Sequence, residues 1–206
     1  MNYLDPSEYE AHGLEATTPL AWIVAASALI DAHCRRPTLD VAQYRERARL
    51  DGGRGTVRLS YLPLATVAPA LTPFVAVLAR YGVPRRGEPL AEAAQEIAQA
   101  FSLPGSWTTL DAATIEFNAD TGEITLPANA LGLTFNELDV TYNAGFSDVP
   151  PPVKVACAQI VRNAQATPAL NVRAGSLDRM HLEYFSDTLL DPTVRKLLSP
   201  WVAQKL

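Results

Sequence analysis

The sequence predicts an α+β fold in which helices pack on a small antiparallel sheet with a hairpin, accompanied by an inserted helix and a C-terminal arm. Three segments carry this prediction. Residues 138–142 alternate apolar and polar side chains, residues 153–164 repeat apolar side chains at helical spacing, and residues 19–34 form a second, more apolar helical segment. Strands bury every second residue and helices bury every third or fourth, so both kinds of element are expected.

A strand, a turn and a helix follow one another within residues 137–166. Leu138, Val140 and Tyr142 alternate with polar residues, as in a strand with one buried face. Gly145 ends the strand because glycine readily adopts the positive φ of a tight turn. The prolines at 150–152 cannot continue a sheet but suit the first turn of a helix. We expect one stripe of that helix to pack on a sheet: Val153, Ala156, Cys157, Ile160, Val161 and Ala164.

This stretch resembles the central signature of the head-to-tail connector (adaptor) proteins of long-tailed bacteriophages and gene transfer agents. The matching order is V-x-Y-x-x-G-F-x-x-V-P-x-x-V-K-x-A, and further parts of the resemblance lie in residues 3–39, 56–68 and 114–166. The residues that match the fold signature are Tyr142, Gly145, Phe146, Pro150, Val153 and Ala156.

The resemblance implies a virion structural protein without a cofactor and not an enzyme. Such a subunit would form a ring, dodecameric in the family, beneath the portal, where it extends the DNA channel and joins the head to the neck or tail. Its partners would be further copies, the portal protein and a stopper or tail-completion protein, with DNA as passing cargo and no membrane. It would be assembled in the host cytoplasm and reside in the virion neck. Another neck component, a stopper or tail terminator, is the alternative, and a small packaging-associated hydrolase is a remote one.

Composition is that of an ordinary globular chain. Its 206 residues are 48% hydrophobic and 19% charged, which predicts one core of ordinary size with room for an inserted lobe. The longest apolar-rich run, Leu20 to Ile30, is too short for a bilayer crossing and follows acidic residues, so neither a membrane span nor a secretory signal is expected. Cys34 and Cys157 lie in apolar helical segments, which favours buried free thiols.

Charge is unevenly distributed along the chain. Residues 1–150 carry 10 basic and 18 acidic side chains, a net charge of −8, whereas residues 151–206 carry 7 and 4, a net charge of +3. A bipolar chain suits head-to-tail or ring association. Chance variation on a solvated surface is the alternative interpretation.

The helix predicted over residues 19–34 is apolar on nearly all sides. Thr17 or Thr18 is expected to cap it, and Ser27 is expected to bond the carbonyl four residues back. A chain of this size has little core to surround such a helix, so we infer that part of it meets a neighbouring subunit. The alternative is that an inserted lobe covers the second face. The residues assigned to the subunit interface are Trp22, Ala26 and Leu29.

The segment Arg35 to Arg58 is the most basic, with seven arginines against three acidic residues, a net charge of +4. Pro37 and the glycine run at 52–55 predict a loop. Four of its arginines are candidates to face the phosphates of passing DNA: Arg45, Arg47, Arg49 and Arg54. More often, such a run is a solvated loop or makes ion pairs with an acidic neighbour. The glycine run lacks the Lys-Ser/Thr of a phosphate loop.

The sequence suggests a connector domain over residues 1–190, with an insertion at about 82–107 that contains a helix beginning at Pro89, and a portal-docking segment over residues 191–206. Pro200 is expected to kink or split the last helix. This segment either folds back on its own core or docks on a partner, and the family favours the portal. The assigned residues are Val194, Leu197, Leu198, Trp201 and Val202.

The remaining elements are short, and no site for chemistry is predicted. Strands are expected at 56–61, 65–68 and 74–81, and a short helix is the alternative for 74–81. A hairpin at 114–126 turns at Gly122 and should lie near the 138–142 strand in space. His12, His33 and His181 fall in different elements, which gives no zinc-binding spacing.

Overall fold

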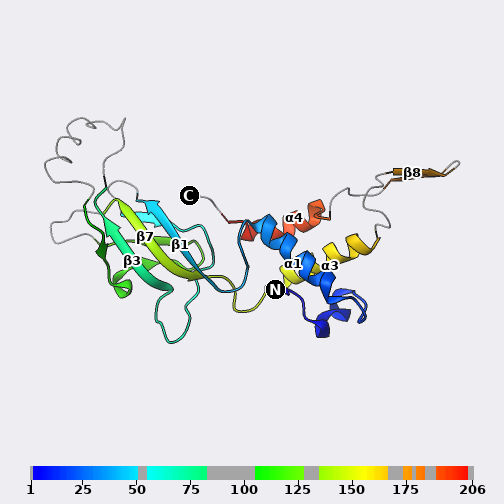
Figure 1. Cartoon of the computed structure of the whole chain (residues 1–206), viewed down its shortest axis with the longest axis horizontal. Helices are drawn as coiled ribbons and strands as arrows, with labels where there is room; N and C mark the ends of the chain where they lie inside the picture. The colour runs from blue at the N-terminus through cyan, green and yellow to red at the C-terminus, as the bar shows by residue number, and fades with distance from the viewer. Residues whose placement is uncertain are drawn as a thin grey trace. The chain divides into compact units, whose positions relative to one another are not determined.

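The computed structural model describes residues 2–50, 55–82, 105–127, 135–166, 174–177, 180–183 and 189–203. The chain divides into two compact units (Figure 1). The helical unit comprises residues 1–39 and 148–203, and the sheet unit comprises residues 40–147. The helices and antiparallel sheets confirm the predicted α+β class.

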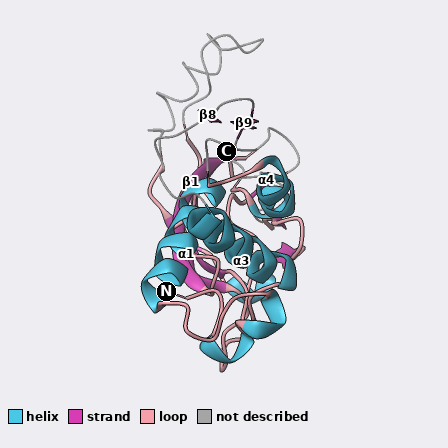
Figure 2. Ribbon diagram, turned by 90° about the vertical axis from the view of Figure 1, so that its right-hand side faces the viewer, coloured by secondary structure: helices cyan, strands magenta, loops and turns pink. Residues whose placement is uncertain are grey.

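Among its described residues, the helical unit contains three α-helices, three short 3-10 helices and one two-stranded hairpin. Figure 2 shows α1 and α3 side by side with α4 next to them. Strands β8 and β9 pair antiparallel. In chain order the elements are η1 (Pro6–Glu8), η2 (Glu10–His12), α1 (Leu20–Cys34), α3 (Pro151–Ala166), β8 (Ala174–Leu177), β9 (Met180–Glu183), α4 (Pro192–Leu198) and η4 (Ser199–Trp201).

The sheet unit contains two antiparallel sheets, of strand order β1-β7-β3-β4 and β2-β6-β5. Residues from both sheets form one buried core, which includes Tyr44, Val77, Ile124 and Val140. The elements are β1 (Ala42–Arg49), β2 (Thr56–Arg58), β3 (Phe74–Arg80), β4 (Thr108–Thr109), η3 (Ala112–Thr114), β5 (Glu116–Phe117), β6 (Glu123–Thr125) and β7 (Glu137–Ala144).

Strand β7 is the centre of the larger sheet. It pairs with β1 along all eight residues and with β3 on its other side. Leu138, Val140 and Tyr142 are fully buried, so the predicted alternation is confirmed. The hairpin β5–β6 does turn at Gly122, whose φ is 67°, but β6 pairs with β2 and β5. The hairpin therefore does not pair with β7, because β1 and β3 occupy both edges of β7. It lies near β7 in space, as expected, since Ile124 of β6 shares the buried core with Val140.

The predicted loop over Arg35 to Arg58 is wrong, because residues 42–49 form β1. Tyr44 and Ala48 are buried while the intervening arginines face outward, so the segment has the period-2 pattern of a strand. Pairing with β7 explains why this arginine-rich segment forms a strand, because acidic residues of β7 lie opposite arginines of β1. The strand expected at 56–61 is shorter, 56–58, and residues 65–68 form no strand, whereas β3 confirms the strand at 74–81.

Helix α3 buries the predicted stripe, including Val153, Ala156 and Ile160. Among the described elements, α3 packs on α1, α4 and η2, so this stripe lies on helices and not on the expected sheet. The physical reason is that α1 and α4 offer apolar faces of their own within the same unit. Lys154 extends the contact to η1, with its Nζ 2.7 Å from a carboxylate oxygen of Glu8.

Helix α1 agrees with its prediction in extent and differs at its N-terminus. The Ser27 hydroxyl donates to the Ile23 carbonyl at 2.8 Å, as expected. No threonine caps the helix: Pro19 occupies the N-cap position, and the Thr18 hydroxyl has no hydrogen-bond partner within the described part of the chain. Both cysteines are buried and free, as predicted. At the other end of the chain, α4 stops at Leu198 and η4 follows, which confirms a split at Pro200.

The predicted insertion begins and ends at neighbouring points of the sheet unit. The Gly105 amide donates to the Tyr81 carbonyl at 2.9 Å. The helix expected to begin at Pro89 lies outside the described residues.

Gly145 lies near the end of the sheet unit and contacts Asp40, the first residue of that unit. Its φ is 130°, and a Cβ there would lie 2.2 Å from the carbonyl oxygen of Asp40. Asp40 and Phe146 form a parallel bridge at the same place. The first and last segments of the unit therefore touch, backbone to backbone, and only glycine allows this approach.

We predict that Gly145→Ala lowers the free energy of unfolding by about 2–4 kcal/mol, because it combines a disfavoured φ with a clash against backbone that cannot move aside. Urea denaturation followed by circular dichroism measures the change. Gly122→Ala is the matched control in the same unit, since its Cβ would meet the mobile end of Leu62. Equal losses in the two variants would contradict the assigned role of the Asp40 contact.

Candidate functional site

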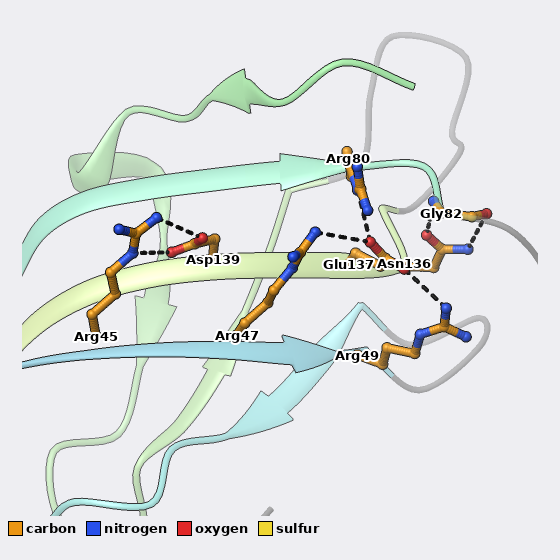
Figure 3. A network of polar contacts seen from close by, with 8 residues as sticks. All are labelled: Arg45, Arg47, Arg49, Arg80, Gly82, Asn136, Glu137 and Asp139. Carbon is orange, nitrogen blue, oxygen red and sulfur yellow. Dashed lines mark hydrogen bonds and ion pairs between the residues drawn. The ribbon is translucent and has the colours of Figure 1, made fainter. Parts of the chain in front are cut away.

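One candidate surface lies on the outer face of the four-stranded sheet, and we call it the arginine face: Arg45, Arg47 and Arg49 of β1 and Arg80 of β3 (Figure 3). The β1 arginines are alternate residues, so strand geometry puts them on one side of the sheet. Arg80 joins them because β3 and β1 flank the same strand, with Arg80 and Arg49 both opposite Glu137.

Glu137 is the shared partner of this face. Its carboxylate is 2.9 Å from Arg49 Nη2, 2.7 Å from Arg80 Nε and 3.8 Å from Arg47 Nη2. Only 10% of its side chain is exposed. Burial acts to raise the pKa of Glu137, but the hydrogen bonds and charges of Arg80 and Arg49 outweigh burial and hold this pKa below its ordinary value.

Asp139 holds the outermost arginine. Arg45 donates through Nε at 2.8 Å and through Nη2 at 2.9 Å to the two carboxylate oxygens. This is the bidentate geometry in which a guanidinium binds a carboxylate best. The hydrogen bond and charge of Arg45 lower the pKa of Asp139, against the effect of burial.

Trp107 stacks against two of the arginines. The guanidinium carbons of Arg47 and Arg80 lie 4.7 Å and 4.5 Å from the centroid of its ring, which is cation–π geometry. Arg47 has no closer carboxylate contact among the described residues than the 3.8 Å pair with Glu137. Its side chain is 56% exposed. Arg47 is thus held in place by stacking while its hydrogen-bond donors stay accessible.

Asn136, next to Glu137, fixes the end of the sheet. Its side chain accepts a hydrogen bond from the Gly82 amide and donates one to the Gly82 carbonyl at 3.1 Å. Its backbone carbonyl accepts from the Leu50 amide at 3.0 Å. The ends of β1 and β3 are therefore both tied to the start of β7, and the arginines and Glu137 sit on a rigid frame.

A second candidate surface is the outward half of α1, which we call the α1 face. Leu20, Trp22 and Val24 are 49%, 41% and 41% exposed. The other exposed positions of the helix are alanines 21, 25, 28 and 32. Asp31 is the one acidic residue of the helix, and it accepts a hydrogen bond from the Tyr3 hydroxyl. The basic residue of the helix, His33, is half-buried in its last turn. The α1 face is therefore uncharged and apolar.

The residues predicted for the subunit interface divide between the two sides of α1. Trp22 belongs to the α1 face, and Leu29 is half-buried beside it. Ala26 is buried inside the helical unit together with Ile23 and Ile30. The sequence shows that the helix is apolar on nearly all sides, but it does not show which side is buried within the helical unit.

The C-terminal residues divide in the same way. Val194 and Leu198 are fully buried in the helical unit, where α4 packs on α3, whereas Leu197, Trp201 and Val202 are half-buried. Asp191 caps α4 by accepting from the Val194 amide at 2.7 Å and also accepts from Asn163 of α3 at 3.1 Å. Folding back on the helical unit therefore accounts for Val194 and Leu198.

The signature residues have structural positions. Tyr142 is buried and its hydroxyl accepts a hydrogen bond from the Tyr61 amide at 3.2 Å. Gly145 and Phe146 make the close approach to Asp40, and Pro150 precedes α3, in which Val153 and Ala156 are buried. Sequence reasoning missed Arg80, Trp107, Glu137 and Asp139 as partners of the arginines. The alternation within residues 42–48 was the available signal. Arg54 lies outside the described residues.

The described residues give little support for metal or thiol chemistry. No group of three or more His, Cys, Asp or Glu side chains is arranged there to hold a metal ion. Burial raises the pKa of the Cys34 and Cys157 thiols to about 11, so both are poor nucleophiles at neutral pH. None of the described helices is long and apolar enough to cross a bilayer.

The sequence matches no known family model, and no curated protein matches it. The resemblance to connector proteins thus depends on the sequence patterns in residues 3–39, 56–68 and 114–166.

We predict that Glu137→Gln lowers the free energy of unfolding by about 1–3 kcal/mol at pH 7, because Arg49 and Arg80 lose their charged partner. Chemical denaturation measures the loss, with Glu116→Gln on the exposed side of β5 as the control.

The same variant tests the pH dependence. Folding lowers the pKa of Glu137 below the ordinary value of a glutamate, about 4.5. Such a carboxyl stabilises the fold above its unfolded pKa, and this contribution disappears as the pH falls through the folded pKa. The difference between wild type and variant should therefore shrink as the pH is lowered below about 4.5. A difference that stays constant from pH 7 to acid would contradict the charge pairing.

Proposed function

We propose that this protein is a virion structural subunit, a head-to-tail connector that assembles into a ring beneath the portal of a tailed phage or gene transfer particle. The observation that carries the proposal is the α1 face. An uncharged helical surface with Leu20, Trp22 and Val24 all more than two-fifths exposed is typical of a subunit that is completed by a partner. The connector signature supports the choice of assembly.

A second copy of the chain is the proposed occupant of the α1 face. The exposed alanines allow another helix to approach closely, and the larger side chains at its start supply apolar area to bury. With no charge on the face, a partner needs no complementary charge, which fits identical subunits around a ring. Ring size, twelve in the family, is part of the proposal.

The portal contact is proposed for the exposed part of the C-terminal segment. Leu197, Trp201 and Val202 stay half-exposed while Val194 and Leu198 anchor α4 to α3. A short apolar segment presented by an anchored helix suits docking into a groove on a partner. A stopper or tail-completion protein would bind elsewhere on the ring, and DNA would pass through it as cargo.

We predict that Ala25→Glu with Ala28→Glu abolishes self-association, because it places two charges on a face that becomes buried. Both alanines are exposed, so the fold and its circular dichroism spectrum should be unchanged. Analytical ultracentrifugation measures the mass, with Val155→Glu, at an exposed apolar position of α3, as the matched control. A wild-type chain that is monomeric at all concentrations would overturn the ring proposal.

We predict that Leu197→Glu with Val202→Glu prevents co-purification with the portal protein while the ring still forms. Val194→Ala should instead destabilise the helical unit by about 1–3 kcal/mol, since a buried side chain loses two methyl groups. Co-expression with the portal and electron microscopy of the particle neck measure the first effect. Binding of the wild-type chain to a tail protein, and not to portal, would favour a stopper or tail terminator.

A further inference from the structure

We propose that the arginine face of the sheet unit binds the phosphate backbone of double-stranded DNA. Three guanidinium groups of β1 stand on one side of the strand, at alternate residues. Alternate residues of a strand are about 6.7 Å apart, so Arg45 to Arg49 form a row of about 13 Å. A row of this length matches an extended polyanion with repeating charges better than a single small anion.

The solvent-exposed charged groups of the arginine face are positive. The side chains of Arg45, Arg47 and Arg49 are 69%, 56% and 41% exposed. The carboxylates that pair with them are covered: Asp139 is 14% exposed and Glu137 is 10% exposed. An anion approaching from solvent therefore meets guanidinium groups first, although the chain as a whole carries a net charge of −5.

The residue type favours phosphate. All four cations of the face are arginines, whose planar fork of N–H donors fits a phosphate in bidentate fashion. The covered carboxylates and Trp107 hold these groups in fixed positions, so less side-chain entropy is lost when an anion binds. Arg47 is the expected centre of the site, because it is stacked on Trp107 and its nearest carboxylate among the described residues is 3.8 Å away.

No base-specific contact is implied, because the proposed contacts are to phosphates alone. Binding should therefore be insensitive to sequence and strongly sensitive to salt. The inference does not require the connector proposal, since it depends only on residues of the sheet unit. A protein that failed to form rings or bind portal could still show this activity, and a ring without it would remain a ring.

The test is fluorescence anisotropy of a labelled duplex of about 30 base pairs, titrated with the full chain over a salt series. Three phosphate contacts give a slope of about −2.7 for log affinity against log salt, or a loss of about 40-fold between about 50 and about 200 mM. In the variant Arg45→Gln with Arg47→Gln, the slope should fall to about −0.9, a loss of about 3- to 4-fold over the same range.

Two control variants separate charge from structure. Arg45→Lys with Arg47→Lys keeps the charges and should keep the slope. Arg58→Gln removes an exposed arginine of β2, whose guanidinium donates to the Thr121 carbonyl, and should leave DNA binding unchanged. Circular dichroism melting, and the oligomeric mass of each variant, ensure that folded species of the same size are compared.

Three results would overturn the inference. The first is no binding of the duplex by the wild-type chain at about 50 mM salt, where phosphate contacts are strongest. The second is an equal loss of affinity in Arg58→Gln. The third is binding of poly-glutamate with no binding of DNA, which would assign the arginine face to an acidic protein surface instead.

Discussion

The close approach of the Gly145 backbone to the Asp40 carbonyl is the constraint on which the two-unit organisation depends. Asp40 is the first residue of the sheet unit and Phe146 is next to its last residue, Ser147. The bridge between Asp40 and Phe146 keeps the two ends of the unit together. Residues before 40 and after 147 therefore leave from neighbouring points, although more than a hundred residues separate them along the chain. This topology lets α1 from one segment and α3 from the other pack as one helical unit.

The sequence pattern predicted the elements in which apolar residues recur at clear strand or helix spacing. Leu138, Val140 and Tyr142 alternate strictly, and α3 repeats its apolar residues at helical spacing, so both were predicted at nearly their observed bounds. Strand β1 was missed because its inward residues include Glu46 and small alanines, which make the alternation weak in hydrophobicity. The partner of α3 was also missed, since periodicity identifies a buried face and says nothing about what covers it.

The candidate surfaces were predictable to different extents for the same reason. Arg45, Arg47 and Arg49 stand out in the sequence, but Asp139 and Glu137 lie about ninety residues away, and only the β1–β7 register brings them opposite. The apolar character of α1 is plain from its residues. Which half is exposed follows from packing on α3 and α4, which buries Ile23, Ala26 and Ile30 and leaves Trp22 outside.

The two surfaces also differ in the association they permit. Strand β1 is at the edge of its sheet, and a long edge strand invites pairing with the edge of another chain. Three exposed arginines oppose such pairing between identical subunits, because like charges would meet across the new ladder. The α1 face carries no such charge. In the proposed ring, self-association would therefore be disfavoured through the sheet and favoured at the helix, which would leave the arginine face open to the proposed anionic partner.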